Sequence, residues 1–331
     1  MKGKWTCFLL LIVLFIIISS LPCWSQKGEV YPPGKIIWLI PYKAGGGFDQ
    51  AARLITPFLS KYLKEKTPGG QIGIVIQNEP ASGGRRAYSK LYEARPDGHT
   101  IGAFDIGFIS DTFTEDVGFD ISKFTFLVRA MKTKRLVVTA KGGPANWEDL
   151  VKLAKGKPLK WGTGAYLQST HLDSIVLTER LGVPVKFIPW AGGTAEVMNA
   201  LMRGDIHVAL VSEDSVRGLL NAGEIKCILE ISEKSAYPGV PTIKDLGHPD
   251  LAFKLGTQRF IVAPPKFPNH LRNIFIDAVK KVMTDEKFRS YTKKVGIEFD
   301  PLYGKEAEQE FKMIFNYYHG VLKPLYLKYA K

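Results

Sequence analysis

The sequence predicts an α/β protein built from two units of alternating strands and helices. Short apolar runs alternate with amphipathic helical stretches over residues 36–104 and again over 159–231, which is typical of a mainly parallel sheet covered by helices. Glycine-rich loops follow several of these runs, and ligands of such sheets bind beyond the carboxyl ends of the strands. A chain of 331 residues has the length for about two domains, each with a hydrophobic core.

The first unit begins with the segment 35–53. Residues 36–40 are apolar and rich in β-branched side chains, which predicts a strand buried on both faces, and Pro41 should end it because proline cannot donate to a ladder. Three consecutive glycines at 45–47 then leave backbone N–H groups uncovered by any Cβ. Asp49 belongs at the N-cap or in the first turn of the helix that follows. Because the free N–H groups and the helix dipole point the same way, the segment predicts an anion site.

This glycine loop has three interpretations. The first is a tight turn between strand and helix that binds nothing. The second is a dinucleotide site, but the loop lacks G-x-G-x-x-G, and it also lacks the G-x-x-x-x-G-K-[ST] of a Walker phosphate loop. The third is a carboxylate held by backbone amides. The loop alone does not decide among them.

The first unit continues with further strands, a second glycine turn and a short helix. Two apolar runs then follow each other with no helix between them, which we interpret as the passage to the second unit. The predicted elements are strands at 72–78 and 99–104, a glycine turn at 79–86, a helix at 87–94, and passage strands at 126–130 and 136–140.

The second unit repeats this order, and its first helix should be capped by Asn146. An apolar run at 260–263 is predicted to be the strand that returns to the first unit. Asn269 should cap the helix that follows it. The last helix carries an aromatic seam that should pack in the core. The predicted elements are a strand and glycine loop at 159–165, a helix at 172–181, a strand at 185–189, a glycine loop at 190–194, a helix at 197–202, a strand at 206–211, a helix at 216–222, a strand at 225–231, and final helices at 269–282, 288–295 and 305–326.

Residues 1–25 are predicted to be an export signal. Two lysines precede an uninterrupted apolar stretch at 8–18, which is too short for a comfortable membrane span. Cleavage after Ser25 is the first choice; lipidation of Cys23 ranks second because a proline precedes that cysteine, and an uncleaved anchor ranks third. We therefore expect a periplasmic protein whose one remaining cysteine, Cys227, forms no internal disulfide.

Composition and motifs argue against several classes of function. The formal charge is +13, but the lysines are scattered and there is no zinc-finger spacing or RNA-binding signature, so we expect no nucleic-acid partner. The six histidines lie far apart, with no H-E-x-x-H, no metal-ligand spacing and no G-x-S-x-G. We therefore expect no metal, no cofactor and no catalytic residues.

The motifs, taken in order, resemble those of one protein family. Residues 41–53 resemble the P-x-x-x-G-G-x-x-D-x-x-A-R signature of the Bug (TctC-like) substrate-binding proteins, the solute receptors of tripartite tricarboxylate transporters. Residues 78–84 resemble that family's N-x-P-G-A-G-G, and 95–100 resemble its P-D-G-Y-T. The resemblance spans about residues 30 to 331. Further matches lie at 162–165, 171–172, 189–194, 204–206 and 240–247.

The resemblance implies a type II periplasmic-binding-protein fold, with two α/β lobes and a ligand cleft between them. Lobe 1 would comprise 26–133 and 258–331, and lobe 2 would comprise 134–257. Backbone amides of one glycine loop from each lobe would hold a small organic carboxylate, such as a dicarboxylate, a tricarboxylate, an acidic amino acid, or a nicotinate-like or aromatic acid. The residues assigned to this site are Ala44, Gly45, Gly46, Gly47, Phe48, Asp49, Ser82, Asp105, Gly162, Thr163, Gly164, Ala165, Ser169, His171 and Gly193.

Some residues depart from the family's pattern. An Ala-Ser pair at 81–82 replaces Gly-Ala, which makes that turn less permissive. Asp105 ends the third strand, where it meets a ligand donor, repels a second carboxylate, or serves as a turn acid; the acids at 213–214 raise the same question in lobe 2. His171 lies near a helix start, where we expect it to donate a hydrogen bond or to support the ligand contacts rather than to act as a base.

These features predict a monomeric extracytoplasmic solute-binding protein that delivers a small carboxylate to the membrane permease of a tripartite tricarboxylate transporter. Two other functions share them. One is a receptor subunit that senses a ligand for a membrane signalling protein, and the other is a hydrolytic enzyme on the same fold. The identity of the carboxylate is not specified by these motifs.

Overall fold

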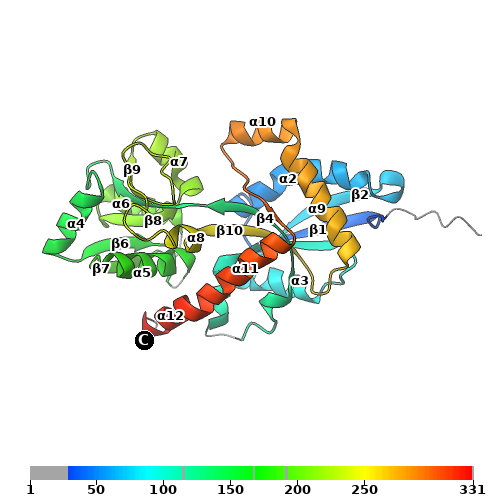
Figure 1. The fold of residues 1–331 in the computed structure, drawn as a ribbon, viewed down its shortest axis with the longest axis horizontal. Helices are drawn as coiled ribbons and strands as arrows, with labels where there is room; N and C mark the ends of the chain where they lie inside the picture. The colour runs from blue at the N-terminus through cyan, green and yellow to red at the C-terminus, as the bar shows by residue number, and fades with distance from the viewer. Residues whose placement is uncertain (1–28, 114–115, 167, 191–192, 330–331) are drawn as a thin grey trace, which may run out of the picture.

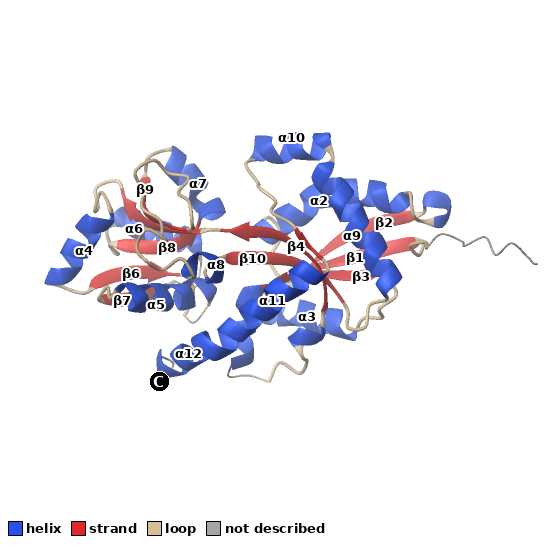
Figure 2. Ribbon diagram, viewed as in Figure 1, coloured by secondary structure: helices blue, strands red, loops and turns tan. Residues whose placement is uncertain are grey.

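The computed structural model describes residues 29–113, 116–166, 168–190 and 193–329, so the predicted signal segment 1–25 lies outside them. The chain forms two bodies side by side, each built on its own sheet and joined by long extended segments (Figure 1). We call the body around the six-stranded sheet lobe 1 and the body around the five-stranded sheet lobe 2. In each lobe the strands lie in the middle and helices cover them (Figure 2).

The chain begins in lobe 1, crosses to lobe 2 between β4 and β5, and returns with β10. The elements before the crossing are β1 (Gly34–Ile40), α2 (Gly47–Lys64), β2 (Ile72–Asn78), α3 (Arg85–Glu93), β3 (Thr100–Asp105) and β4 (Thr125–Thr133), with short 3₁₀ turns at Pro68–Gly70, Ala81–Gly84, Ile106–Phe113 and Ile121–Lys123. The elements of lobe 2 are β5 (Arg135–Ala140), α4 (Trp147–Gly156), β6 (Leu159–Thr163), α5 (Ser169–Leu181), β7 (Val185–Pro189), α6 (Thr194–Arg203), β8 (Val208–Ser212), α7 (Glu213–Asn221), β9 (Ile225–Ile231) and α8 (Leu251–Lys254). After the return come β10 (Thr257–Ala263), α9 (Asn269–Thr284), α10 (Glu286–Val295), β11 (Leu302–Tyr303), α11 (Lys305–Tyr317), a π-helical turn (Tyr318–Leu322) and α12 (Lys323–Tyr329).

Both sheets are mixed, so the prediction of mainly parallel sheets was wrong. In lobe 1 the order is β11-β4-β10-β3-β1-β2; β1 runs parallel to β2 and β3, whereas β10 runs antiparallel to β3 and β4. In lobe 2 the order is β7-β6-β8-β5-β9, and β5 runs antiparallel to β8 and β9. The reason is that β5 and β10 each arrive from the other lobe and enter at the carboxyl ends of the parallel strands.

This topology brings the carboxyl ends of both sheets to the junction between the lobes. Arg259 at the start of β10 lies opposite Asp105 at the end of β3. Arg135 at the start of β5 lies opposite Ser212 at the end of β8. The loops that follow β1, β3, β6 and β8 therefore face the space between the lobes, which is where a ligand of such a fold binds.

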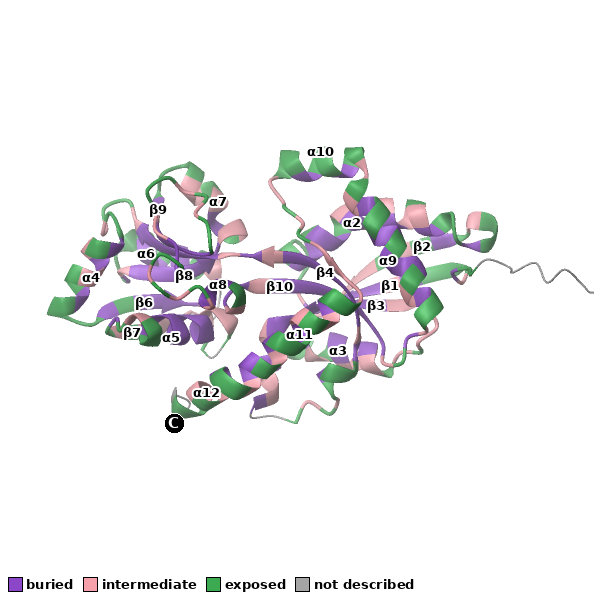
Figure 3. Cartoon of the chain, viewed as in Figure 1, coloured by how far each residue is buried: buried purple, intermediate pink, exposed green. Residues whose placement is uncertain are grey.

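The central strands of both sheets are largely buried, whereas the edge strands β2 and β7 are mostly intermediate or exposed (Figure 3). In β1, Ile36 and Ile40 are fully buried, which confirms the predicted strand and its end at Pro41. Asn146 caps α4 as predicted, because its side chain accepts a hydrogen bond from the Asp149 N–H at 2.8 Å. Asn269, which we predicted as a cap, is instead the first residue of α9.

The C-terminal helices bridge the two lobes. The predicted aromatic seam is confirmed as core, since Phe311 stacks on Phe126 with 3.8 Å between the ring centroids. From α11 the chain continues through the π-helical turn into α12, which lies beside α5 of lobe 2 (Figure 1). There Leu325 and Tyr326 pack against Leu172 of α5.

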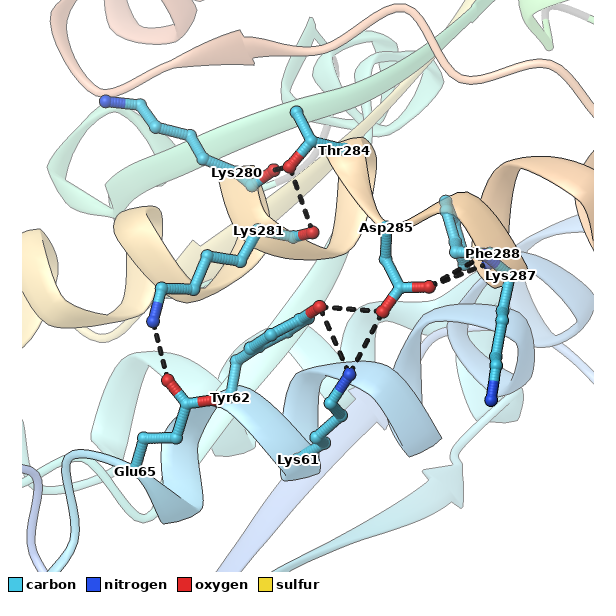
Figure 4. Close-up of polar contacts among 9 residues, drawn as sticks. All are labelled: Lys61, Tyr62, Glu65, Lys280, Lys281, Thr284, Asp285, Lys287 and Phe288. Atoms are coloured by element: carbon cyan, nitrogen blue, oxygen red, sulfur yellow. Dashed lines mark hydrogen bonds and ion pairs between the residues drawn. The ribbon is translucent and has the colours of Figure 1, made fainter.

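A polar cluster ties α2 to the α9–α10 corner (Figure 4). Asp285 accepts hydrogen bonds from the Tyr62 hydroxyl at 2.6 Å and from Lys61 Nζ at 3.2 Å, and it also caps α10. These bonds, the one from Tyr62 foremost, lower the pKa of Asp285 to about 2. Lys281 pairs with Glu65 at 2.6 Å nearby. The cluster fixes the direction of α2, whose other end carries the first glycine loop.

Candidate functional site

The first glycine loop lies between β1 and α2 at the lobe junction. Residues 44–47 are exposed, and α2 begins at Gly47. Asp49 is buried in the first turn, where its Oδ2 accepts hydrogen bonds from the Gly45 N–H at 2.9 Å and from Arg53 Nε at 2.8 Å. Burial acts to raise the pKa of Asp49, but these bonds hold it below its ordinary value. Asp49 thus folds the loop back on itself and occupies the Gly45 N–H that we expected to be bare.

Arg259 lies directly against this loop, and the sequence analysis missed it. A Cβ added to Gly47 would stand 2.6 Å from Arg259 Nη2, so this close approach requires glycine. The guanidinium also lies 5.1 Å from the centre of the Phe48 ring, within the range of a cation–π contact. Arg259 directly precedes the apolar run 260–263 and is the one charged residue of its strand, which was the signal that could have indicated it.

The acid that faces Arg259 comes from the other lobe. Asp214, in the first turn of α7, places its Oδ2 2.7 Å from Arg259 Nη2. Its neighbour Glu213 stays within lobe 2, where it accepts a hydrogen bond from the Tyr237 hydroxyl at 3.1 Å. Of the two acids whose direction the sequence left open, Asp214 therefore reaches across the junction.

A groove of about 730 Å³ opens here between the lobes. We call it the interlobe groove. Its cationic side chains outnumber its acids, which concentrates small anions near it. The charged residues that line it are Lys132, Lys134, Arg217, Arg259, Lys293 and Lys294 on the basic side and Glu213, Asp214 and Glu298 on the acidic side. Among the described residues of the lining, Gly47 comes from the predicted site and none comes from 162–165.

The glycine loop of lobe 2 at residues 162–165 is more tightly packed than we expected. A Cβ at Gly162 would stand 2.2 Å from the Ile206 side chain, so Gly162 serves packing inside lobe 2. Thr163 is fully buried. The Gly164 N–H donates to Thr170 Oγ1 at 3.0 Å, whereas Gly164 and Ala165 remain partly exposed.

Ser169 and Asp105 approach each other from opposite lobes. A Cβ at Gly107, just after β3, would lie 3.4 Å from the Ser169 side chain at the start of α5. Asp105 accepts hydrogen bonds from the Tyr42 hydroxyl at 2.6 Å and from the Gly107 N–H at 3.0 Å. Burial, and then the Asp105 carboxylate, raise the pKa of Tyr42 well above its ordinary value. Asp105 thus holds the turn that brings the β3 exit next to α5.

A buried ion pair anchors α5 to the crossing strand. Arg135 Nε lies 2.9 Å from Asp173 Oδ2, and both side chains are almost fully buried. Arg135 Nη2 also donates to Ser169 Oγ at 3.2 Å, and Nη1 donates to Ser212 Oγ. Burial raises the pKa of Asp173, while Arg135 acts against that rise. The start of α5 is therefore held in place by the strand that enters lobe 2 at the crossing.

The remaining predicted residues lie at separate places. Ser82 is exposed and adopts a positive φ of 53° in the turn after β2. Gly193, with a φ of 76°, forms the N-cap of α6. Within the described ranges, no three His, Cys, Asp or Glu side chains are grouped so that they could hold a metal ion. Over the same ranges, no helix combines the length and apolar character needed to span a bilayer.

His171 is buried, with its ring centroid 4.9 Å from that of Tyr166 and 5.1 Å from that of Phe187. Burial lowers the pKa of His171 to about 4, so the imidazole is neutral near pH 7 in the folded protein. Below pH 6.5 the unfolded chain therefore binds a proton at His171 more readily than the folded protein does. The folded state keeps its full stability above this unfolded pKa and loses stability as the pH falls from 6.5 toward 4.

We expect wild-type protein to lose about 1.4 kcal/mol of unfolding free energy through His171 between pH 7.5 and 5.5. Urea unfolding of wild type and His171→Gln at both values measures this, and the other histidines cancel in the comparison. Equal pH slopes for the two proteins would contradict the assignment.

The fold defined by these two lobes and their crossing strands is that of the periplasmic binding proteins. Residues 63–319 match the TctC family, described as the tripartite tricarboxylate transporter family receptor, and the chain belongs to this family. Its members are binding proteins rather than enzymes.

Individual relatives are distant but cover most of the chain. The UPF0065 protein in the tcbD-tcbE intergenic region of Pseudomonas sp. (strain P51) is 24% identical over 309 residues, which cover 88% of this chain and 89% of that protein. MatC from Rhodopseudomonas palustris, solved with bound malate, matches with a TM-score of 0.69 and 20% identity over 88% of this chain and 99% of that one. Another R. palustris protein, solved with adipate, matches with a TM-score of 0.72 and 21% identity over 88% and 97% of the two chains.

Proposed function

We propose that this receptor captures a small organic carboxylate in the interlobe groove and delivers it to the permease of a tripartite tricarboxylate transporter. The observation that carries the proposal is the Arg259 guanidinium, which lies against Gly47 inside a groove with a predominantly basic charged lining. A guanidinium matches a carboxylate with two parallel hydrogen bonds. Two structural relatives were solved with the dicarboxylates malate and adipate, which supports this ligand class.

We also propose the lobe boundaries, the oligomeric state and the location of the mature protein. The lobes divide at 26–133 plus 258–331 and 134–257, and the chain acts as a monomer in the periplasm after loss of residues 1–25. Closure of the lobes on the ligand follows from its contacts to both, because a ligand that binds one arrangement better shifts the population toward it.

The predicted ligand contacts enter this proposal with one addition. Of these residues, Gly47 represents the segment 44–49 in the described lining of the groove. The other predicted residues, Ser82, Asp105, 162–165, Ser169, His171 and Gly193, lie outside that lining and stay predictions. Arg259 is the addition, and it supplies the charge that backbone amides alone lack.

A thermal-shift screen of purified protein lacking residues 1–25 tests the proposal. We expect malate, adipate or another small carboxylate to stabilise the folded state by about 2.7 kcal/mol at a hundredfold excess over Kd. The amide derivative of each active acid is the matched control and should not stabilise. Stabilisation by neutral or cationic solutes alone would contradict a carboxylate receptor.

A further inference from the structure

An ion pair that spans the lobes lies in the interlobe groove. Arg259 belongs to β10 of lobe 1 and Asp214 to α7 of lobe 2, and Nη2 and Oδ2 lie 2.7 Å apart. The side chains are 11% and 26% exposed, so the pair is largely removed from water. A cation this deeply buried needs an anionic partner, because burial of an unpaired charge is costly.

Asp214 leaves the hydrogen-bonding capacity of Arg259 partly unused. The pair rests on the single contact between Oδ2 and Nη2. Nη1 meets the Met131 sulfur at 3.6 Å, which is a weak acceptor, and Nε is buried with no hydrogen-bond partner among the described residues. A carboxylate that met the guanidinium with both oxygens would satisfy more of these donors.

Asp214 is also well placed to give up its partner. It lies in the first turn of α7, where the helix dipole favours a negative charge whether or not Arg259 is near. Its other oxygen, Oδ1, meets Ser215 Oγ at 3.3 Å on the exposed side. Release of Arg259 would therefore leave Asp214 partly exposed at a helix N-terminus that favours its charge, whereas the more deeply buried Arg259 could not be left unpaired.

We propose that Asp214 is an internal competitor of the ligand. In the free protein its carboxylate takes the place on Arg259 that a ligand carboxylate takes on binding, and binding exchanges one carboxylate for the other. This inference rests on the proposed function. The same pair links the lobes before the ligand arrives, so Asp214 both sets the ligand affinity and restricts the opening of the free protein.

The first experiment measures binding of malate and adipate by titration calorimetry to wild type, Asp214→Asn and Arg259→Gln. We expect Asp214→Asn to bind on the order of fivefold more tightly, since the ligand no longer displaces a competitor, and Arg259→Gln to lose binding. The matched control is Asp205→Asn, which removes a carboxylate of lobe 2 that pairs with Arg203 in the same lobe. Unchanged or weaker binding by Asp214→Asn would overturn the proposal.

The second experiment needs no ligand, so it separates this inference from the proposed function. Spin labels at Lys155→Cys in α4 and Lys287→Cys in α10, both exposed, report the distance between the lobes in protein that lacks residues 1–25 and carries Cys227→Ser. In free protein, Asp214→Asn should broaden the distance distribution toward longer values, and Asp205→Asn should not. An unchanged distribution in Asp214→Asn would overturn the proposal. Failure of wild type to bind any carboxylate would instead count against the proposed function.

Discussion

Gly47→Asp is expected to abolish carboxylate binding, with an affinity loss of at least about a hundredfold, or roughly 3 kcal/mol. A Cβ at this position would stand 2.6 Å from Arg259 Nη2, which is closer than real contacts allow, so the guanidinium must move. The added carboxylate would then pair with Arg259 from within lobe 1 and repel the ligand. Helix α2 itself should tolerate the change, because an acid is favourable in the first turn.

Titration calorimetry with the carboxylate that stabilises wild type measures this loss. Gly142→Asp is the matched control, since it makes the same charge change at an exposed position of lobe 2 with nothing within 4 Å of the added Cβ. Gly47→Ala separates the effect of the Cβ from that of the charge. Unchanged affinity in Gly47→Asp would show that the ligand does not bind beside this loop.

The local parts of the site could be predicted from sequence because they depend on neighbouring residues. A β-branched run ended by Pro41, three glycines and an acid in the first turn define the strand, loop and helix of 34–64 without reference to the rest of the chain. The ordered motifs then indicated the family, which the match over 63–319 confirms.

The partners of the loop could not be predicted, because the two crossings place them. Arg259 reaches Gly47 only because β10 returns from lobe 2 antiparallel to β3 and places Arg259 opposite Asp105. The glycine motif points to backbone amides, and nothing within it indicates a cation that lies far away in the chain. The same crossings explain why the sheets are mixed.

Glycines show this difference between local and tertiary signals most clearly. The sequence predicts that Gly162 and Gly164 belong to one glycine loop, whereas in the structure the two residues make different contacts. Gly162 makes room for the Ile206 side chain, and Gly164 makes room for Thr170 Oγ1, to which its N–H donates. Such close packing depends on side chains that arrive from other elements, so no pattern within the loop could reveal it.

Gly84→Ala is expected to lower the free energy of unfolding by about 3 kcal/mol, through two effects that act together. Gly84 adopts a φ of +92°, which strains any residue that carries a Cβ. That Cβ would also stand 2.7 Å from Pro41 Cβ and 2.8 Å from the Pro41 carbonyl oxygen. Since the carbonyl belongs to the backbone at the end of β1, the clash displaces the turn at 81–84, the first glycine loop, or both.

Gly83→Ala is the control that separates strain from contact. Gly83 also has a positive φ, of +64°, but nothing lies within 4 Å of its added Cβ, so the expected loss is about 1 kcal/mol. Urea unfolding of the two variants and wild type gives both values, provided that the slope with denaturant stays constant. Equal losses would mean that the turn moves away from Pro41 at no cost. A larger loss for Gly84→Ala means that the turn and the end of β1 form one rigid wall, against which the ligand loop is held.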